Sequence, residues 1–332
     1  MSNVTSSIAR AVRRTLGPSW IALAISLVIV AVAAATLFRV FRDIELGRVV
    51  AALKAQSLRG LFLSGGFVGA GYLVLTCYDV FALRAIGRTN VPYRVAALAS
   101  FTSCTIGHSF GAAIFTSGFI RYRIYSAWGL NIGEIARIAF FTGLTYWLGN
   151  AFVLGCGIAL APAAVSAVNH LPAPINRLIG LATLVAINGY MLWLWAGPRT
   201  IGRAHWRIVL PDTASTLVQI GIGSLDLTVV SLAMYAVLPS QPVMGFFSLM
   251  VIFVTAMLIG VVSYVPGSLG VMEAAMFIGL PQFRTEDLLA SLVSFRVLYF
   301  VIPLLLAALL LGWREVRSVA AAMGPGSINV RK

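Results

Sequence analysis

Apolar residues fall into runs of about 20 that alternate with short loops containing arginine. A helix needs roughly 20 apolar residues to cross a hydrocarbon core of about 30 Å, so runs of this length predict transmembrane helices. The predicted segments are 19–38, 60–83, 95–117, 131–160, 177–197, 213–238, 244–280 (interrupted) and 288–313. The expected fold class is therefore an all-α integral membrane protein with about eight hydrophobic helical segments.

These segments define a polytopic membrane domain over residues 19–313, an N-terminal segment at 1–18 and a tail at 314–332. The first segment follows three arginines and ends at Phe38 without a small-residue cleavage site, so we predict a retained span and not a signal peptide. Apolar and cationic residues are mixed between 41 and 59. This pattern suits an amphipathic helix in the headgroup plane, or an ordinary polar loop.

Composition supports the membrane assignment and excludes other classes. Hydrophobic residues make up 60% of the chain and charged residues 10%, whereas soluble domains carry about 25% charged residues. Net charge is +14, but the cations flank the apolar runs and form no single patch, so we expect membrane topology and no nucleic-acid partner. Cys77, Cys104 and Cys156 lie in apolar stretches without disulfide or metal-ligand spacing, so no metal or cofactor is expected.

Arginine counts in the short loops place both termini on the cytoplasmic side of a bacterial inner membrane. Segment 95–117 has cationic residues at both ends, which a simple crossing does not allow. A re-entrant hairpin resolves the conflict, and its centre has the glycines and polar groups of a turn at membrane depth. The predicted helix-break residues here are Gly107, His108 and Gly111. We therefore predict that Arg94 and Arg121 share the cytoplasmic side.

Segment 244–280 contains a second predicted break, at Pro266, Gly267 and Gly270. Proline removes an amide donor and glycine loosens the backbone, so a helix is interrupted there. Freed backbone groups at this depth must line a protein interior or a wet cavity. We expect the two breaks to approach one shared polar cavity.

Spacing of polar residues suggests an internal repeat. Asp79 and Asp226 are separated by 147 residues, Gly118 and Gly267 by 149, and the pairs Gly129-Leu130 and Gly279-Leu280 by 150. With the topology above, the two units would be inverted copies, which is a common build of transporters with the substrate between the copies. Chance similarity among apolar sequences is the alternative.

Four ionisable residues are predicted within apolar helices: Asp79, Asp226, Glu273 and Arg296. Inserting a charged side chain at the centre of a membrane costs about 2.5 to 3.5 kcal/mol. Each of these residues therefore needs an ion-pair partner, a water-filled cavity or a functional role. For Asp226 and Glu273 the alternatives are substrate binding and structural ion pairing. Asp79 also suits a solvated helix end, whereas Arg296 requires an acid or an anionic ligand.

Arg121 and Arg123 follow the first predicted hairpin. The planar fork of arginine suits phosphate, so these residues are candidate phosphate ligands, or else cytoplasmic anchors. His108 suits a ligand contact or a structural hydrogen bond. The sequence contains no nucleophile elbow, zinc-protease motif or phosphate-binding loop, and no aqueous domain that would hold a nucleotide, so we expect no enzyme.

Three motifs resemble a known family. They are Tyr-Asp-Val-Phe-Ala-Leu-Arg at 78–84, Arg-Tyr-Arg-Ile-Tyr-Ser-Ala-Trp-Gly-Leu at 121–130 and Val-Pro-Gly-Ser-Leu-Gly-Val-Met-Glu at 265–273. They are similar to the membrane domain of the bifunctional lysylphosphatidylglycerol synthetase/flippase family (MprF-like), including its stand-alone YbhN-like members. The chain departs from the family at Ser268, where a second glycine is usual, and at 117–120, where glycines and a small residue are usual.

The resemblance implies translocation of aminoacylated phosphatidylglycerol, for example lysylphosphatidylglycerol, without the aminoacyl transferase domain. The expected phosphate ligands are Arg121, Arg123 and Arg296, and the expected amine ligands are Asp79, Asp226 and Glu273. Expected partners are the phospholipid, a lipid aminoacyltransferase and a second copy of the chain. The alternatives are a transporter or scramblase of another anionic or lipid-linked substrate, and a membrane partner of an aminoacyltransferase without transport activity.

Overall fold

The structure is a computed structural model that describes residues 46–110, 113–169, 171–197, 199–201 and 208–322. Within this part of the chain, five helices are long and apolar enough to cross a membrane. They are α4 (Leu58–Ala85), α7 (Ile132–Leu160), α9 (Ala173–Trp195), α10 (Thr213–Val237) and a last helix, Thr285–Arg314. The last comprises α13 (Thr285–Arg296), a π-helical segment η3 (Val297–Val301) and the start of α14 (Ile302–Ala322). The prediction of an all-α membrane protein is confirmed.

Shorter elements connect these helices. The helical ones are α3 (Leu46–Ala55), α5 (Tyr93–Phe110), α6 (Ala113–Tyr125), η1 (Ser126–Trp128), α8 (Pro162–Asn169), α11 (Phe246–Val262), η2 (Pro266–Ser268) and α12 (Val271–Gly279). A small antiparallel ribbon pairs β1 (Thr200–Ile201) with β2 (Ile208–Val209), Thr200 opposite Val209. The predicted count of eight segments is not confirmed, because segments 95–117 and 244–280 are each divided between two shorter helices. Segment 19–38 lies outside the described residues.

The first predicted break lies later than expected. Gly107 and His108 belong to the last turn of α5, which continues to Phe110, so the prediction of a helix break at these two residues is wrong. Glycine lowers helix stability by only about 1 kcal/mol, which the packing of α5 against α4 and α6 offsets. Gly111 lies outside the described residues, between α5 and α6.

The second predicted break is confirmed. Helix α11 ends at Val262, and α12 begins only at Val271. Between them Gly267 and Gly270 adopt φ angles of 61° and 79°, which side chains disfavour and glycine tolerates. Ser268 also has a left-handed φ of 51°. The chain thus reverses sharply, so α11 and α12 pack against one another.

Helix starts follow local sequence signals. Asn131 and Glu134 form a reciprocal capping box at the start of α7. Ser57 caps α4 through the amide of Gly60, and Asp212 caps α10 through the amide of Ser215. Hydrogen bonds from the side chain and backbone of Ser215 lower the pKa of the Asp212 carboxyl group. The capped ends fix where α7 and α10 begin.

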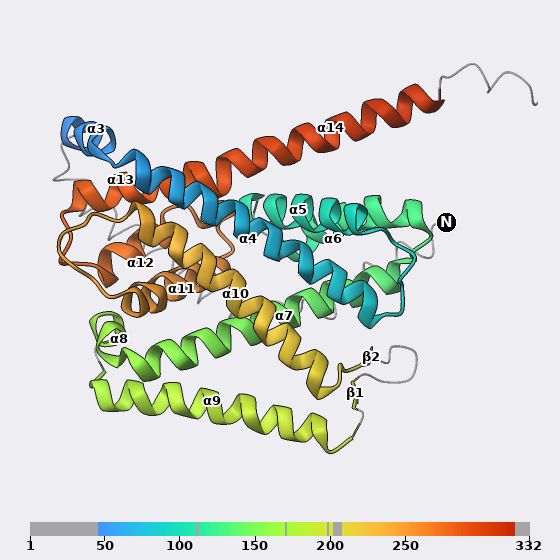
Figure 1. Ribbon diagram of the computed structural model, residues 1–332, viewed down its shortest axis with the longest axis horizontal. Coiled ribbons are helices and arrows are strands. Elements are labelled where there is room, and N and C mark those ends of the chain that lie inside the picture. The colour runs from blue at the N-terminus through green and yellow to red at the C-terminus, as the bar shows by residue number, and fades with distance from the viewer. Residues whose placement is uncertain (1–45, 111–112, 170, 198, 202–207, 323–332) are drawn as a thin grey trace, which may run out of the picture.

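Helices α4 and α10 form the centre of the molecule, where they pack against one another and run in opposite directions (Figure 1). The pair α5 and α6 lies towards the end where α10 begins, and the pair α11 and α12 lies towards the end where α10 finishes. The two pairs meet near the middle, because η2 packs against α5. A Cβ atom at Gly267 would lie 3.4 Å from the carbonyl oxygen of Ser109.

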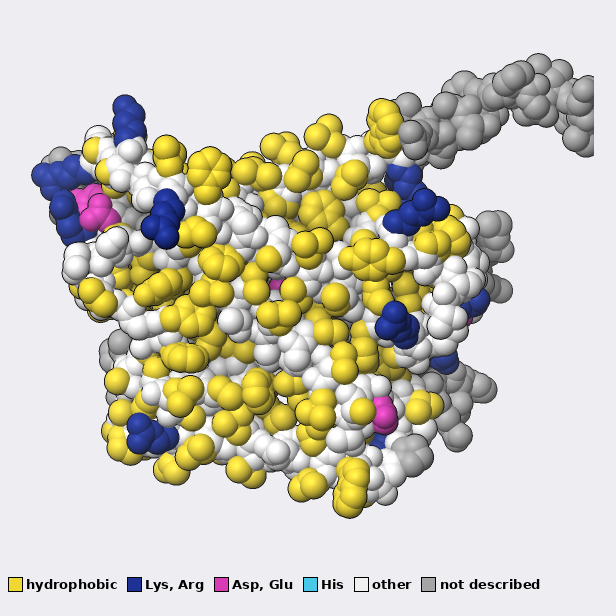
Figure 2. Space-filling model, viewed as in Figure 1, with side chains coloured by type: hydrophobic (Ala, Val, Ile, Leu, Met, Phe, Trp, Pro, Cys, Tyr) yellow, Lys and Arg dark blue, Asp and Glu magenta, His cyan; other side chains and the backbone are white. Residues whose placement is uncertain are grey.

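The surface is consistent with a protein surrounded by lipid. Figure 2 shows a broad hydrophobic face, with most of its arginine and lysine side chains near the two ends of the long axis. Exposed large apolar residues include Phe62 and Leu73 on α4, Leu192 and Trp195 on α9, and Leu309 on α14. Such a surface suits hydrocarbon, with the cations at the headgroup levels.

The amphipathic stretch predicted at 41–59 contains a helix, α3, over its described part. It packs against α13, with an ion pair of 3.9 Å between Arg48 and Glu286. Just after α3, the Gln56 side chain accepts a hydrogen bond from Ser294 at 2.6 Å. Figure 1 shows α3 end-on, across the direction of the long helices. This orientation is the one that a helix lying in a headgroup plane would have.

Helices α7 and α10 cross at two glycines. A Cβ atom at Gly223 would lie 2.6 Å from the carbonyl oxygen of Thr145 and 2.9 Å from the Cα atom of Gly149. Small residues allow helix backbones to approach closely in membranes, where packing replaces the hydrophobic effect as the driving force. The α10 backbone is thereby held directly against α7.

We expect Gly223→Ala to destabilise the fold by about 1 to 3 kcal/mol, because the new methyl group must separate two backbones. Gly221→Ala is the matched control, since a Cβ atom at Gly221 meets nothing within 4 Å. Thermal unfolding of both purified variants measures the difference. Equal stability of the two variants would show that the crossing is loose.

Candidate functional site

A buried ion pair joins α4 to α6. The Arg121 guanidinium donates two hydrogen bonds to Asp79 Oδ1, at 2.8 and 3.2 Å, and one to Oδ2 at 3.1 Å. The Tyr125 hydroxyl donates to Asp79 Oδ2 at 2.7 Å. Asp79 is 0% exposed and Arg121 4% exposed. The carboxylate is therefore neutralised and surrounded by donors.

This geometry changes the expectation for both residues. Asp79 is not a solvated helix end, because its side chain is enclosed between α4 and α6. Nor is Arg121 a surface anchor. The sequence predicted a phosphate ligand and an amine ligand that act separately, whereas here each group is the other's counter-ion. Arg123, two residues further on, is exposed.

Asp226 is the most isolated of the predicted charges. It lies midway along α10, is 5% exposed, and accepts one hydrogen bond, from the Tyr78 hydroxyl to Oδ2 at 3.1 Å. Its other oxygen, Oδ1, is buried without a hydrogen-bond partner among the described residues. Asp226 is also close enough to Tyr72, Tyr146 and Tyr299 to interact with them electrostatically. A carboxylate here has a hydroxyl donor but no cation beside it in the described structure.

A second ion pair is built into the Pro-Gly break. Glu273 Oε1 accepts a hydrogen bond from Arg296, while Oε2 accepts from the amide of Gly270 at 2.8 Å. Arg296 also donates to the carbonyl oxygens of Gly267 at 2.9 Å and Ser268 at 3.1 Å. The freed backbone groups of the break are thus satisfied by two charged side chains. Both residues therefore have a structural task in this conformation.

We expect Glu273→Gln to destabilise the protein by about 2 kcal/mol, less than the 3 to 5 kcal/mol of a fully buried pair, because the Arg296 side chain is 16% exposed. The amide still accepts from Gly270 but no longer neutralises the guanidinium. Thermal unfolding of Glu273→Gln and of the control Glu286→Gln measures the effect, because Arg48, the partner of Glu286, is 57% exposed and stays solvated when its counter-ion is removed. Wild-type stability of Glu273→Gln would contradict the structural role.

His108 lies in the last turn of α5, close enough to Arg121 for an electrostatic interaction. Its Nδ1 atom is buried without a hydrogen-bond partner in the described part of the chain. The structure therefore brings His108, Arg121 and Asp79 to one region and places Glu273 with Arg296 in another. Gly267 and Ser109 connect the two regions by direct packing.

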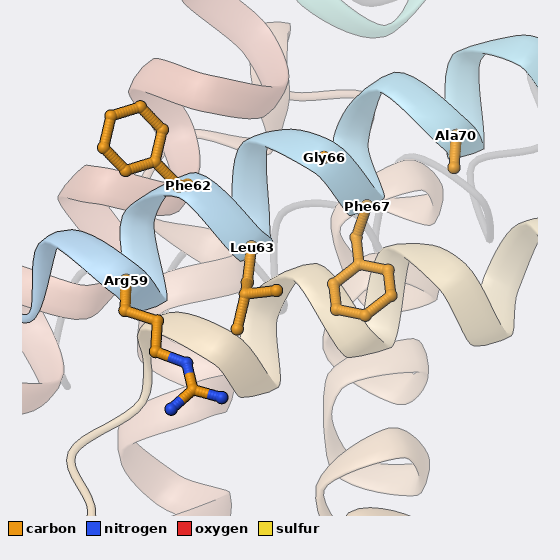
Figure 3. Close-up of a pocket in the computed structure, with 6 residues that line it drawn as sticks. All are labelled: Arg59, Phe62, Leu63, Gly66, Phe67 and Ala70. Atoms are coloured by element: carbon orange, nitrogen blue, oxygen red, sulfur yellow. The ribbon is translucent and has the colours of Figure 1, made fainter.

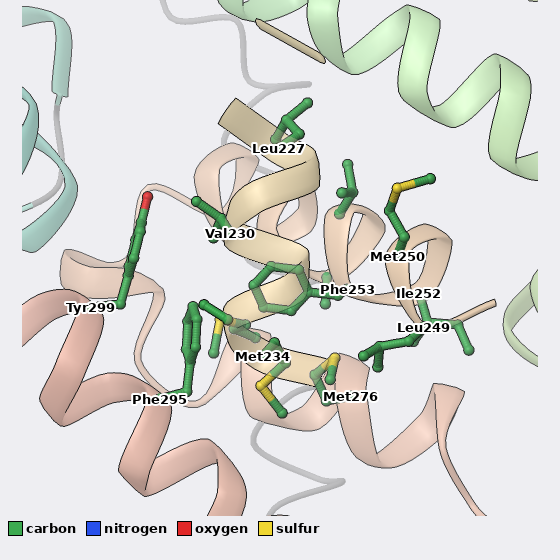
Figure 4. Close-up of a cluster of buried hydrophobic side chains, with 14 of the residues drawn as sticks. Leu227, Val230, Met234, Leu249, Met250, Ile252, Phe253, Met276, Phe295 and Tyr299 are labelled. Carbon is green, nitrogen blue, oxygen red and sulfur yellow. The ribbon is translucent and has the colours of Figure 1, made fainter. Parts of the chain in front are cut away.

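Two apolar grooves each have an arginine in the lining. One is a cavity of about 580 Å³ beside the first half of α4, and Figure 3 shows Arg59, Leu63 and Phe67 on one side of that helix. The other, of about 370 Å³, lies at the start of α9 beside Arg177. Neither is the polar cavity that we predicted between the two breaks. In this conformation the breaks meet in a packed contact.

Several partners of these charges were not predicted from the sequence. Tyr78 and Tyr125 hold the two aspartates, and Tyr72 donates to the carbonyl oxygen of Tyr299 in the π-helical segment at 2.9 Å. Tyr125 is four residues after Arg121, hence one helical turn away, and this spacing predicts that the two side chains lie on the same side of the helix. The other tyrosines reach their partners through tertiary packing.

The fold and these charges define a polytopic helical membrane protein with charged side chains inside its helix bundle. No family model matches the chain. It is 32% identical over 248 residues to the inner membrane protein YbhN of Escherichia coli, which covers 73% of the chain and 76% of YbhN. An uncharacterised protein of Synechocystis, slr0712, is 31% identical over 246 residues, covering 74% and 76%. The chain therefore belongs to the family of YbhN-like inner membrane proteins.

A more distant relative is named for an enzyme activity. The phosphatidylglycerol lysyltransferase of Staphylococcus xylosus is 23% identical over 304 residues, which is 90% of the chain and 34% of that protein. The likeness thus extends over nearly all of the present chain and about a third of the transferase. It supports the membrane family that the three sequence motifs predicted.

Proposed function

We propose that the protein translocates an aminoacylated phosphatidylglycerol, such as lysylphosphatidylglycerol, across the bacterial inner membrane and is not itself an enzyme. The observation that carries the proposal is Asp226, a carboxylate in the bundle interior whose Oδ1 atom lacks a partner among the described residues. Retaining such a group inside a membrane is costly, so it marks a functional site. An ammonium group of the lipid would supply the missing donor.

The nearby Asp79–Arg121 pair fits the remaining charges of this headgroup. Lysylphosphatidylglycerol has one phosphate and two ammonium groups. During passage, Arg121 would exchange Asp79 for the phosphate, and Asp79 would accept an ammonium group, so that no charge is left without a counter-ion. The described conformation, with the pair closed, would then be the resting one.

The order of elements supports a transporter. A long helix, two shorter packed helices and another long helix occur in α4 to α7, and the same order recurs in α10 to α14. Their first helices, α4 and α10, run antiparallel (Figure 1). We interpret the two units as inverted copies with the lipid headgroup passing between them, and we place both termini in the cytoplasm.

The transferase relative supports phosphatidylglycerol as the lipid, because it is named phosphatidylglycerol lysyltransferase. A lipid aminoacyltransferase is the partner we propose, since such an enzyme would supply the substrate, and a second copy of the chain is a further candidate. The apolar groove beside Arg59 offers a place for an acyl chain outside the bundle, with the guanidinium at one end.

The test is lipid analysis of each leaflet in cells that express a lysylphosphatidylglycerol synthetase with or without this protein. We expect the outer-leaflet share of lysylphosphatidylglycerol to rise with the protein while the total stays constant. A change in the total alone would indicate a partner of the synthetase without transport activity. A change confined to another anionic lipid would show that this lipid, and not lysylphosphatidylglycerol, is the transported substrate.

A further inference from the structure

The groove beside the first half of α4 follows two rows of side chains on that helix. Each row has a spacing of four residues, and together they line the cavity of about 580 Å³: Arg59, Leu63 and Phe67 in one row, and Phe62, Gly66 and Ala70 in the other. Figure 3 shows the first row on one side of the helix, with Arg59 at its start. The groove is open at Gly66, where a Cβ atom would meet nothing within 4 Å.

The length of the groove corresponds to one leaflet of a bilayer. At a helical rise of about 1.5 Å per residue, Ala70 lies about 17 Å along α4 from Arg59. One leaflet contributes about 15 Å to a hydrocarbon core of roughly 30 Å. Arg59 is in the first turn of α4, which begins at Leu58, so its guanidinium is at the end of the groove nearest the headgroups.

The charge of the groove fits a phosphate and not an amine. Apart from Arg59, its lining consists of apolar side chains and one glycine, and it contains no carboxylate among the described residues. Arg59 is exposed and makes no ion pair or hydrogen bond within the described part of the chain. A guanidinium binds a phosphate through two parallel hydrogen bonds, so the headgroup end of the groove has the donor that a phospholipid requires.

We propose that the groove binds one anionic glycerophospholipid of the surrounding bilayer, with its phosphate on Arg59 and one acyl chain along Leu63, Gly66 and Phe67. A cation at the headgroup level, followed by an apolar groove of one leaflet's length, matches the two parts of a phospholipid. A second copy of the chain would instead have to place an anion against Arg59. The bilayer supplies the lipid at high concentration, whereas a protein partner is dilute.

The position of the groove gives this lipid a place in transport, and that role rests on the proposed function. Asp79 follows Arg59 by 20 residues on the same helix, which is about 30 Å along its axis. The groove and the Asp79–Arg121 pair are therefore near the headgroup levels of opposite leaflets. With Arg94 on the cytoplasmic side, the groove belongs to the outer leaflet and holds the phospholipid after translocation.

The test uses the full chain in phosphatidylcholine vesicles, with Leu63→Trp as a fluorescent reporter in the groove. A small fraction of phosphatidylglycerol with brominated acyl chains is added, because bromine quenches tryptophan on contact. We expect this lipid to quench as strongly as an about fivefold higher fraction of brominated phosphatidylcholine, which is the effect of about one cation on an anionic lipid. Arg59→Gln should remove this preference. The chain without the reporter gives the signal of the native tryptophans.

Matched controls separate the groove from the rest of the lipid-facing surface. Leu73→Trp is the control reporter, since Leu73 is exposed on the same helix and does not line the groove, and the two lipids should quench it nearly equally. Gly66→Leu should fill the groove and remove the preference seen with Leu63→Trp, whereas Gly69→Leu should retain it. A Cβ atom at either glycine meets nothing within 4 Å, so both variants should fold.

Two results would overturn the site. Equal quenching of Leu63→Trp by the two lipids would show unselective contact with the bilayer. Quenching by both lipids far below that of Leu73→Trp would show that protein, either a second copy or another segment of this chain, covers the groove. The assay uses phosphatidylglycerol without lysine and involves no translocation, so its failure is distinguishable from failure of the leaflet analysis that tests the proposed function.

Discussion

Replacing Arg121 by leucine should destabilise the protein by about 3 to 5 kcal/mol, because Asp79 would remain fully buried without its cation. Tyr125 would still donate one hydrogen bond, which compensates only part of the loss. The expected result is a strong fall in the amount of folded protein in the membrane, with a lowered unfolding temperature for the fraction that remains.

The double variant Asp79→Asn/Arg121→Leu distinguishes the effect of an unpaired buried charge from the effect of altered side-chain packing. It removes both ions, so its stability should return to within about 1 to 2 kcal/mol of wild type. Arg123→Leu is the control, since this arginine is exposed. Additive effects of the two single substitutions in the double variant would contradict the pairing seen in the structure.

Asp226→Asn should abolish most transport while leaving the protein in the membrane. Asparagine retains the size of the side chain and accepts from Tyr78, and loss of a charge from a membrane interior eases insertion. We expect the outer-leaflet share of lysylphosphatidylglycerol to fall about tenfold, as loss of one charge-assisted contact would produce. The measurement is leaflet analysis beside quantitation of the protein.

Asp287→Asn serves as the matched control, because this acid lies in the first turn of α13 and outside the bundle centre. It should transport as wild type. Normal protein level together with normal lipid exposure in Asp226→Asn would remove Asp226 from the transport mechanism. Loss of the protein itself would instead indicate that Asp226 is structural.

The sequence predicted the long helices and the second break because their causes are local. Runs of apolar residues determine α4, α7, α9 and α10, and Pro266 with Gly267 interrupts a helix wherever it occurs. The first break was placed too early at Gly107, since a lone glycine does not end a helix that neighbours support. Glu273 lies three residues after Gly270, which is a capping spacing, so its amide contact was also accessible from sequence.

Pairing of the charges was not predictable in the same way. Asp79 and Arg121 are 42 residues apart, and Glu273 and Arg296 are 23 apart, so each pair depends on how helices pack. Apolar patterning assigns residues to spans without specifying which faces meet. The isolation of Asp226 likewise follows from the position of α10 between α4 and α7. The predicted set of charged residues was therefore more reliable than the separate ligand roles assigned to them.

The central claim is that this protein alone moves an aminoacylated phosphatidylglycerol between leaflets. Its most direct test uses the purified chain in vesicles containing lysylphosphatidylglycerol, with an amine reagent that does not cross the membrane. Outer-leaflet lipid should react at once, and the inner-leaflet lipid should follow in a slower phase whose rate increases with the amount of protein and is lost in Asp226→Asn. A slow phase that is equal in vesicles with and without the protein would contradict the account.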